Sequence, residues 1–175
     1  MVKPLLILAI ILVLAFPFVA DAQFQVGKSY AGPAIGLSFL GSTLQFGANY
    51  EYGMKMDFGT VGIGGLFRYW SYGEDFGFGK WKYTDILIGA QGNYHFKLEN
   101  DKIDPWAGLV LAYDAGSVKW DGPFATYAEP THGGLFLGAH AGARYFFSPT
   151  MAVSARFGLG TLSYSSLDIG LDWKF

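Results

Sequence analysis

The ten residues SLDIGLDWKF, at positions 166–175, alternate strictly between polar and apolar side chains. Every charged residue of this stretch lies at an even position. The apolar set occupies the odd positions, namely Leu167, Ile169, Leu171, Trp173 and Phe175. Because successive side chains of a β-strand point to opposite faces, this period of two predicts a strand with one apolar and one polar face.

The same period recurs in seven segments upstream. These segments cover about residues 30–39, 44–52, 61–69, 85–96, 106–115, 135–146 and 151–160. Clusters of turn-forming residues at 56–59, 99–102 and 148–150 separate several of them. The sequence therefore predicts eight strands of about ten residues, which is the length that a tilted strand needs to cross a bilayer.

The composition indicates a membrane protein. Charged residues make up 15% of the 175-residue chain and hydrophobic residues 51%, whereas soluble domains carry about 25% charged residues. The net charge of −2 provides no basic surface, so no nucleic-acid partner is expected. The absence of cysteine excludes a disulfide framework, a thiolate metal site and a cysteine nucleophile.

Residues 1–22 are predicted to be a cleaved signal peptide. Lys3 precedes an apolar run at 5–19, and Ala20-Asp21-Ala22 has the small-x-small pattern of a cleavage site. The alternative is an N-terminal membrane anchor, but the run is shorter than the roughly 20 residues of a spanning helix. The mature domain would be 23–175. It contains no long uncharged apolar stretch, so its hydrophobicity must lie on the strand faces.

Two architectures could use such strands. A soluble sandwich or lipocalin-like barrel turns its apolar face inward, whereas a membrane barrel turns that face to lipid and keeps polar residues in the lumen. The strand length, the absence of charge on the apolar face and the many glycines on the polar face favour the second. The predicted fold is an all-β, eight-stranded antiparallel transmembrane β-barrel with an up-and-down meander.

The C-terminal strand ends on Phe175, with Trp173, Leu171, Ile169 and Leu167 at every second position before it. It resembles the terminal strand of bacterial outer-membrane barrels, which the barrel-assembly machinery reads. With the signal peptide and eight strands, the chain resembles the small OmpA/OmpX-type outer-membrane β-barrel superfamily, without a peptidoglycan-binding domain. The resemblance implies an integral, monomeric protein of a Gram-negative outer membrane that contacts lipid and lipopolysaccharide, with both termini periplasmic.

The predicted lumen is polar and nearly balanced in charge. Its ionisable residues are Glu51, Arg68, Asp85, Asp114, His140, Arg144, Arg156, Asp168, Asp172 and Lys174. A barrel of eight strands is just wide enough for side chains to fill it. These residues are therefore interpreted as a structural salt-bridge network, and the alternative is a gated path for ions or small solutes.

Hairpin geometry predicts neighbours within this network. If Phe146 faces Thr150, His140 faces Arg156. If Leu159 pairs with Leu167, Arg156 faces Gly170 and lies diagonal to both acids of the last strand. An Arg156 cluster with Asp168 and Asp172 is therefore expected.

No catalytic, metal or cofactor site is expected. His140, Ser154 and Asp172 all face inward, but a Ser-His-Asp set there would sit in a filled lumen. The histidines show no metal-binding spacing. A remote alternative function is that of a barrel enzyme that modifies lipid A.

The connections at 71–80 and 115–131 are expected to face the cell exterior. The second contains the candidate surface-contact residues Lys119, Trp120, Phe124 and Tyr127, although its aromatic residues could equally pack within the loop. The predicted function is non-enzymatic and concerns outer-membrane integrity or cell-surface interaction. The alternative is a small porin. Aromatic residues near strand ends, Trp106 among them, are expected to anchor the barrel in the membrane interfaces.

Overall fold

A computed structural model of the protein describes residues 24–123 and 130–175. The predicted signal peptide at 1–22 and the candidate contact residues Phe124 and Tyr127 lie outside the described residues. Among the described residues, no helix has the length and hydropathy that a membrane-crossing helix requires.

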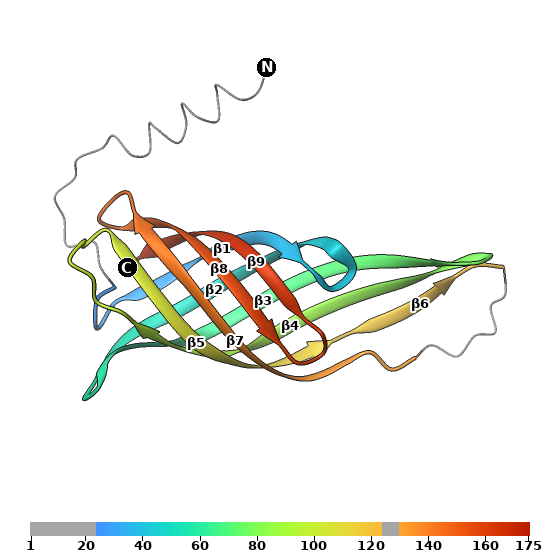
Figure 1. Ribbon diagram of the computed structural model, residues 1–175, viewed down its shortest axis with the longest axis horizontal. Helices are drawn as coiled ribbons and strands as arrows, with labels where there is room; N and C mark the ends of the chain where they lie inside the picture. Colours follow the sequence, from blue (N-terminus) through green and yellow to red (C-terminus); the bar gives the residue numbers. More distant parts are fainter. Residues whose placement is uncertain (1–23, 124–129) are drawn as a thin grey trace, which may run out of the picture.

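The described chain is a closed antiparallel β-barrel (Figure 1). Its strands are β1 (Ser29–Ser38), β2 (Thr43–Met56), β3 (Gly59–Phe76), β4 (Gly79–His95), β5 (Ile103–Ala115), β6 (Ser117–Asp121), β7 (Gly133–Phe146), β8 (Met151–Gly160) and β9 (Ser165–Lys174). Both β5 and β6 pair with β4 and are separated only by Gly116, so they continue one another. Since β1 pairs with β2 on one side and β9 on the other, eight strand positions close the barrel, as predicted.

The distribution of side chains is that of a membrane barrel. Apolar residues of the outward face are open, with exposed fractions of 60% for Ile88, 70% for Leu109 and 65% for Leu135. Polar residues of the inward face are buried, and Gln45 and Glu51 have no exposed surface. This arrangement suits a protein whose outer wall contacts lipid and whose interior satisfies its polar groups internally.

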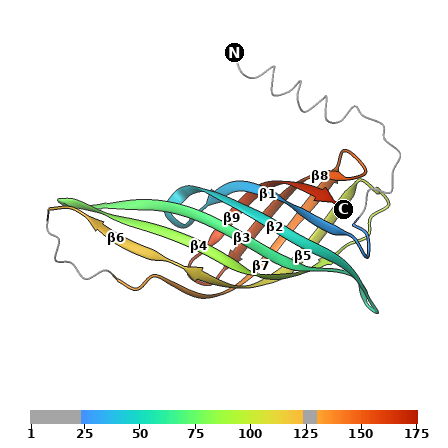
Figure 2. The same ribbon diagram turned by 180° about the vertical axis from the view of Figure 1, so that it is seen from behind.

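Strands β3, β4 and β6 continue far beyond the rest of the barrel. They project as a ribbon from the end opposite the C-terminus, which both views show (Figures 1 and 2). Pairing of β3 with β4 runs without a break to Phe76 and Gly79. The prediction of a loop at 71–80 was therefore wrong, because cross-strand aromatic pairs support a strand there despite the glycines. The rings of Tyr72 and Tyr83 stack 4.6 Å apart.

Two predicted hairpin registers were wrong by two residues. His140 pairs with Gly158 rather than Arg156, and Arg156 pairs with Asp168 rather than Gly170. The turns are the reason. Four residues separate β8 from β9, and two of them, Leu162 and Ser163, adopt positive φ angles of 57°, which non-glycine residues rarely do.

Candidate functional site

The barrel interior gathers the residues predicted to face the lumen. Nine of the ten ionisable candidates are buried: Glu51, Arg68, Asp85, Asp114, His140, Arg144, Arg156, Asp168 and Asp172. The tenth, Lys174, is half-buried near the end of β9. The period of two explains their location, because each of them occupies one of the alternate positions of its strand that face the lumen.

Arg144 of β7 is the centre of the network at the end that holds the C-terminus. Its Nη2 lies 2.5 Å from Glu51 Oε2 and its Nη1 lies 3.2 Å from Asp104 Oδ2. Its Nε donates a 2.9 Å hydrogen bond to Asp172 Oδ2. The guanidinium thus joins three carboxylates from β2, β5 and β9. Because all four side chains are buried, pairing of this kind offsets the cost of removing each charge from solvent.

His95 completes this cluster. Its Nδ1 lies 2.8 Å from Asp104 Oδ1 and its Nε2 lies 3.0 Å from Glu51 Oε1. The ring of Phe24 covers the imidazole in parallel, with 3.5 Å between centroids. The Trp106 ring lies 4.7 Å from the Arg144 guanidinium carbon, a cation–π contact. These groups pack against one another inside this end of the barrel, beside a cavity of about 220 Å³ that Phe24, His95 and Asp104 help to line.

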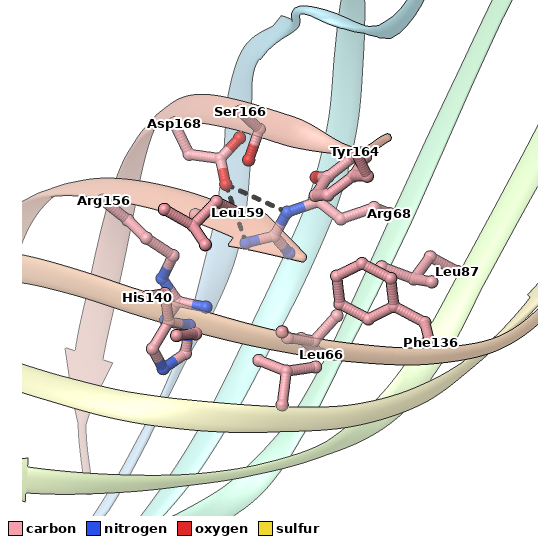
Figure 3. Close-up of a pocket in the computed structure, with 14 residues that line it drawn as sticks. Leu66, Arg68, Leu87, Phe136, His140, Arg156, Leu159, Tyr164, Ser166 and Asp168 are labelled. Atoms are coloured by element: carbon pink, nitrogen blue, oxygen red, sulfur yellow. Dashed lines mark hydrogen bonds and ion pairs between the residues drawn. The ribbon is translucent and has the colours of Figure 1, made fainter. Parts of the chain in front are cut away.

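A second cluster surrounds Arg68 of β3 nearer the middle (Figure 3). Its Nη2 lies 3.0 Å from Asp168 Oδ2 and also donates to Asn49 Oδ1. Gln45 donates to the other oxygen of Asp168, and its own carbonyl accepts a 2.8 Å bond from the Tyr164 hydroxyl. The Asp168 carboxylate and the Arg68 guanidinium therefore each have more than one hydrogen-bond partner, as buried charged groups require.

The expected Arg156 cluster with Asp168 and Asp172 is not formed as an ion pair. Arg156 and Asp168 are cross-strand neighbours, but Arg156 Nη1 donates to Gln91 Oε1 at 3.0 Å. Asp168 pairs with Arg68 and Asp172 pairs with Arg144. The reason is geometric: arginines on distant strands reach these acids across the lumen, which pairing between adjacent strands cannot reveal.

Sequence reasoning missed several interior residues. Asp104 falls between the predicted turn at 99–102 and the predicted strand at 106–115, yet it is a buried partner of both Arg144 and His95. Trp106 was assigned to the membrane interface, yet it is buried in the lumen. Both lie at even positions of β5, as do Gly108 and Asp114, whose positions face the lumen. Extending the alternation of the fifth strand back past Pro105 would therefore have found them.

An apolar layer closes the barrel above Arg68. Its buried members are Leu66, Trp70, Leu87, Val110, Ala112, Phe136 and Tyr164. The cavity between this layer and the charged residues has a volume of about 30 Å³, which is room for about two water molecules. The interior is therefore packed rather than open.

We expect the barrel to show no conductance in planar lipid bilayers. A layer of buried apolar side chains interrupts the polar lumen, and ions do not readily enter an apolar, unhydrated layer. Single-channel recording in concentrated KCl should show a flat baseline, with a wide porin added last as the positive control. Reproducible current steps from the purified protein would contradict the packed interior.

The residues of the conceivable catalytic set have other partners. Asp172 is bound by Arg144, and His140 Nε2 contacts the Asn93 side-chain oxygen. In the described part of the chain, neither forms the hydrogen bonds of a Ser-His-Asp relay with the other.

The ribbon carries the described candidate contact residues. Lys119 and Trp120 belong to β6, and the Trp120 ring lies 4.9 Å from that of Trp81. Lys82 forms an exposed ion pair with Asp121, 2.5 Å apart. This pair holds the pKa of the Asp121 carboxyl below its usual range.

A titration can check that ion pair. A lowered pKa in the folded state means that the pair favours folding above the ordinary aspartate pKa, and that this contribution is lost as pH falls through the folded value. NMR titration should find the pKa of Asp121 below the ordinary value, and Lys82→Gln should return it to normal. An unchanged pKa in Lys82→Gln would show that the pair does not persist in solution.

Comparison with known proteins identifies the fold. No protein-family model matches the sequence, and no curated protein sequence does. Among solved structures, the Ail protein of Yersinia pestis in complex with the heparin analogue sucrose octasulfate is 15% identical, with a TM-score of 0.60 over 86% of this chain and 100% of that one. OprG from Pseudomonas aeruginosa is 12% identical, with a TM-score of 0.59 over 89% and 99%. The N-terminal barrel of Pseudomonas aeruginosa OprF is 15% identical, with a TM-score of 0.55 over 86% and 98%.

At these identities the likeness concerns the fold. The chain has the fold of the small eight-stranded outer-membrane β-barrels, and its structural neighbours are outer-membrane proteins.

Proposed function

We propose that the protein is a non-enzymatic outer-membrane barrel that supports membrane integrity and presents the β3–β4–β6 ribbon to the cell exterior. The observation that carries the proposal is this ribbon, which extends a closed barrel at the end opposite the C-terminus (Figure 2). Because the membrane conceals the barrel wall, an extension of this kind is the part free to meet a partner.

The proposal includes the route to the membrane. Residues 1–22 direct export and are removed, both termini of the barrel stay in the periplasm, and the barrel-assembly machinery recognises Leu167, Ile169, Leu171, Trp173 and Phe175. The position of Phe175 supports this role, because it exchanges two 2.9 Å backbone hydrogen bonds with Ser29 at the seam between the first and last strands. The barrel acts as a monomer among lipid and lipopolysaccharide.

The packed interior argues against the porin alternative. A conducting barrel needs a polar path along its axis, whereas here Trp70, Phe136 and the Arg144 cluster occupy the cross-section. The interior network is better suited to holding the wall rigid.

The chemistry of the ribbon favours contact through aromatic faces. Beyond the barrel, its charged residues are balanced between three acids and three bases: Glu74, Asp75, Asp121, Lys80, Lys82 and Lys119. Such a surface attracts neither polyanions nor polycations strongly, although Ail was solved with a sulfated heparin analogue. Phe78, at the tip, is 86% exposed, and Trp81 and Trp120 pack beside each other further down. Phe78 and these two half-buried tryptophans are the part of the ribbon that we propose meets a partner.

The orientation can be tested directly because the chain has no cysteine. A membrane-impermeant maleimide should label Phe78→Cys on intact cells and label Asp57→Cys, in the β2–β3 turn, only after permeabilisation. The reverse pattern would overturn the proposed orientation.

The surface role is tested by shortening the ribbon. Replacing residues 73–82 by Asn-Gly joins Tyr72 to Tyr83, which already pair across the strands, through a two-residue turn. We expect this variant to keep the heat-modifiable gel shift of a folded barrel and the detergent resistance of the cells, but to lose adhesion to surfaces or other cells. Unchanged adhesion would refute the interaction role, and unchanged detergent resistance after deletion of the whole gene would refute the integrity role. Because the protein is proposed to be non-enzymatic, lipid A from cells with and without the gene should have the same mass spectrum.

A further inference from the structure

A second group of ionisable residues lies near the base of the ribbon, apart from the Arg144 and Arg68 clusters. It consists of Asp85 of β4, Asp114 of β5 and His132, which immediately precedes β7. One ligand atom from each residue lies within 4.8 Å of the other two. Both aspartates are buried, whereas the His132 side chain is 22% exposed.

Four polar atoms of this group lack a hydrogen bond of ordinary geometry. Neither oxygen of Asp85 has a hydrogen-bond partner among the described residues, and Asp114 Oδ1 has none. His132 Nε2 lies 2.6 Å from Asp85 Oδ1, an ion-pair distance, but the contact lacks the geometry of a hydrogen bond. Such an offset is expected where both atoms face a common third position.

No lysine or arginine neutralises the two aspartates of this group, and His132 is the one basic side chain in contact with Asp85 among the described residues. Within the described chain, no lysine or arginine forms an ion pair with Asp85 or Asp114, whereas Glu51, Asp168 and Asp172 each pair with an arginine. Two neighbouring carboxylates in a buried space repel each other, and this cost falls if a positive ion lies between them.

We propose that Asp85, Asp114 and His132 bind one divalent transition metal ion of the Zn²⁺ type. One imidazole nitrogen and two carboxylate oxygens form a ligand set that Zn²⁺ accepts, and three protein ligands leave the fourth tetrahedral position to water. The imidazole disfavours Ca²⁺ and Mg²⁺, which take oxygen ligands.

The surrounding backbone fixes the imidazole. A Cβ at Gly116 would lie 2.6 Å from His132 Cδ2, so only glycine leaves room for the ring there. The edge of the imidazole packs against Tyr83, with 5.3 Å between ring centroids. Gly133, with a φ of 87°, then turns the chain into β7. An ion at this point would tie β4, β5 and the start of β7 together beneath the ribbon.

His95 shows why proximity to acids is not sufficient. Its two ring nitrogens contact different carboxylates, Asp104 at Nδ1 and Glu51 at Nε2. The acids therefore lie on opposite sides of the ring and cannot share an ion with it. The sequence predicts no metal site because positions 85, 114 and 132 are far apart and form no motif; only the fold brings them together.

Equilibrium dialysis of the untagged, detergent-folded protein against ZnCl₂ tests the proposal, after chelator treatment and with metal quantified by mass spectrometry. We expect one Zn²⁺ per barrel in the wild type and in the control Asp121→Asn, which alters an exposed aspartate of the ribbon. Asp114→Asn and His132→Gln should weaken binding by at least about 10-fold, since loss even of residues that only support metal ligands costs this much. Millimolar Ca²⁺ or Mg²⁺ should not displace the ion.

Thermal unfolding supplies a second readout. Zn²⁺ should raise the Tm of the wild type and of Asp121→Asn but not that of His132→Gln, because only a folded site that binds the ion gains stability from it. The gel shift verifies that each variant is folded. Absence of stoichiometric Zn²⁺ in the wild type, or equal binding by folded Asp114→Asn and His132→Gln, would overturn the proposal. If only His140→Gln lost Zn²⁺ binding, the ion would lie at another site, and the proposal would also be overturned.

Discussion

Replacing Arg144 by leucine should destabilise the barrel by about 3–5 kcal/mol, the usual cost of removing one partner from a buried ion pair. The guanidinium contacts Glu51, Asp104 and Asp172. Its loss leaves three carboxylates around a side chain that cannot compensate them, and only His95 still faces two of them. Urea unfolding in lipid vesicles, followed by tryptophan fluorescence, measures the loss.

Arg156→Leu is the matched control. Arg156 is also a buried arginine of the lumen, but its guanidinium donates to the neutral amide of Gln91, so its replacement should cost about 1.5–3 kcal/mol, the range for a hydrogen bond to a charged group. Arg144→Lys keeps the charge without the forked geometry and should fall between the two. It also supplies the comparison if Arg144→Leu does not fold. Equal losses for Arg144→Leu and Arg156→Leu would show that the three-carboxylate cluster does not carry the stability assigned to it.

A positive charge on the outer wall should have the second largest effect. Leu109 lies at the middle of β5 and points outward. Because arginine at the centre of the bilayer costs a lipid-facing barrel position about 2–4 kcal/mol, we expect Leu109→Arg to lower the free energy of unfolding in vesicles by that amount.

Phe78→Arg is the control for that variant. It places the same residue on a more exposed site at the ribbon tip, outside the bilayer in the proposed arrangement. The substitution there should change stability by less than about 0.5 kcal/mol. A small effect at Leu109, or an equal effect at both sites, would contradict a lipid-facing position for Leu109.

The faces of the strands could be predicted from the sequence because they depend only on local parity. The alternation of Leu167, Ile169 and Leu171 with Asp168 and Asp172 appears unchanged as an outward and an inward face. The closed barrel follows, since strands with one lipid-compatible face cannot leave their edges unpaired in a membrane.

Register and cross-lumen pairing could not be predicted in the same way. Register depends on turn conformations such as the positive φ at Leu162 and Ser163, which nothing in their side chains signals. The partners of Arg144 come from residues up to 93 positions away in the sequence. Their approach is set by barrel diameter and strand tilt, which local alternation does not encode.

The ribbon shows a further limit of sequence patterns. Residues 71–80, which contain glycines at 73, 77 and 79, were predicted to be a connection, but Tyr72 and Tyr83 stack across the strands, and Trp81 and Trp120 pack together. Gly73 and Gly79 occupy positions where a neighbouring side chain needs room, whereas Gly77 adopts a positive φ of 61° in the turn. A Cβ at Gly79, for example, would meet the Trp120 ring.

The central claim is that this barrel faces lipid with its apolar side and encloses a packed polar interior. Electron paramagnetic resonance of single spin-labelled cysteines, introduced into the cysteine-free chain and reconstituted in vesicles, tests it most directly. Labels at Leu109, Leu135 and Ile169 should collide readily with oxygen and rarely with a water-soluble nickel complex, whereas a label at Phe78 should show the opposite preference. Ready collision with the nickel complex at Leu109, Leu135 and Ile169 would contradict the account, because it would place the apolar face in water.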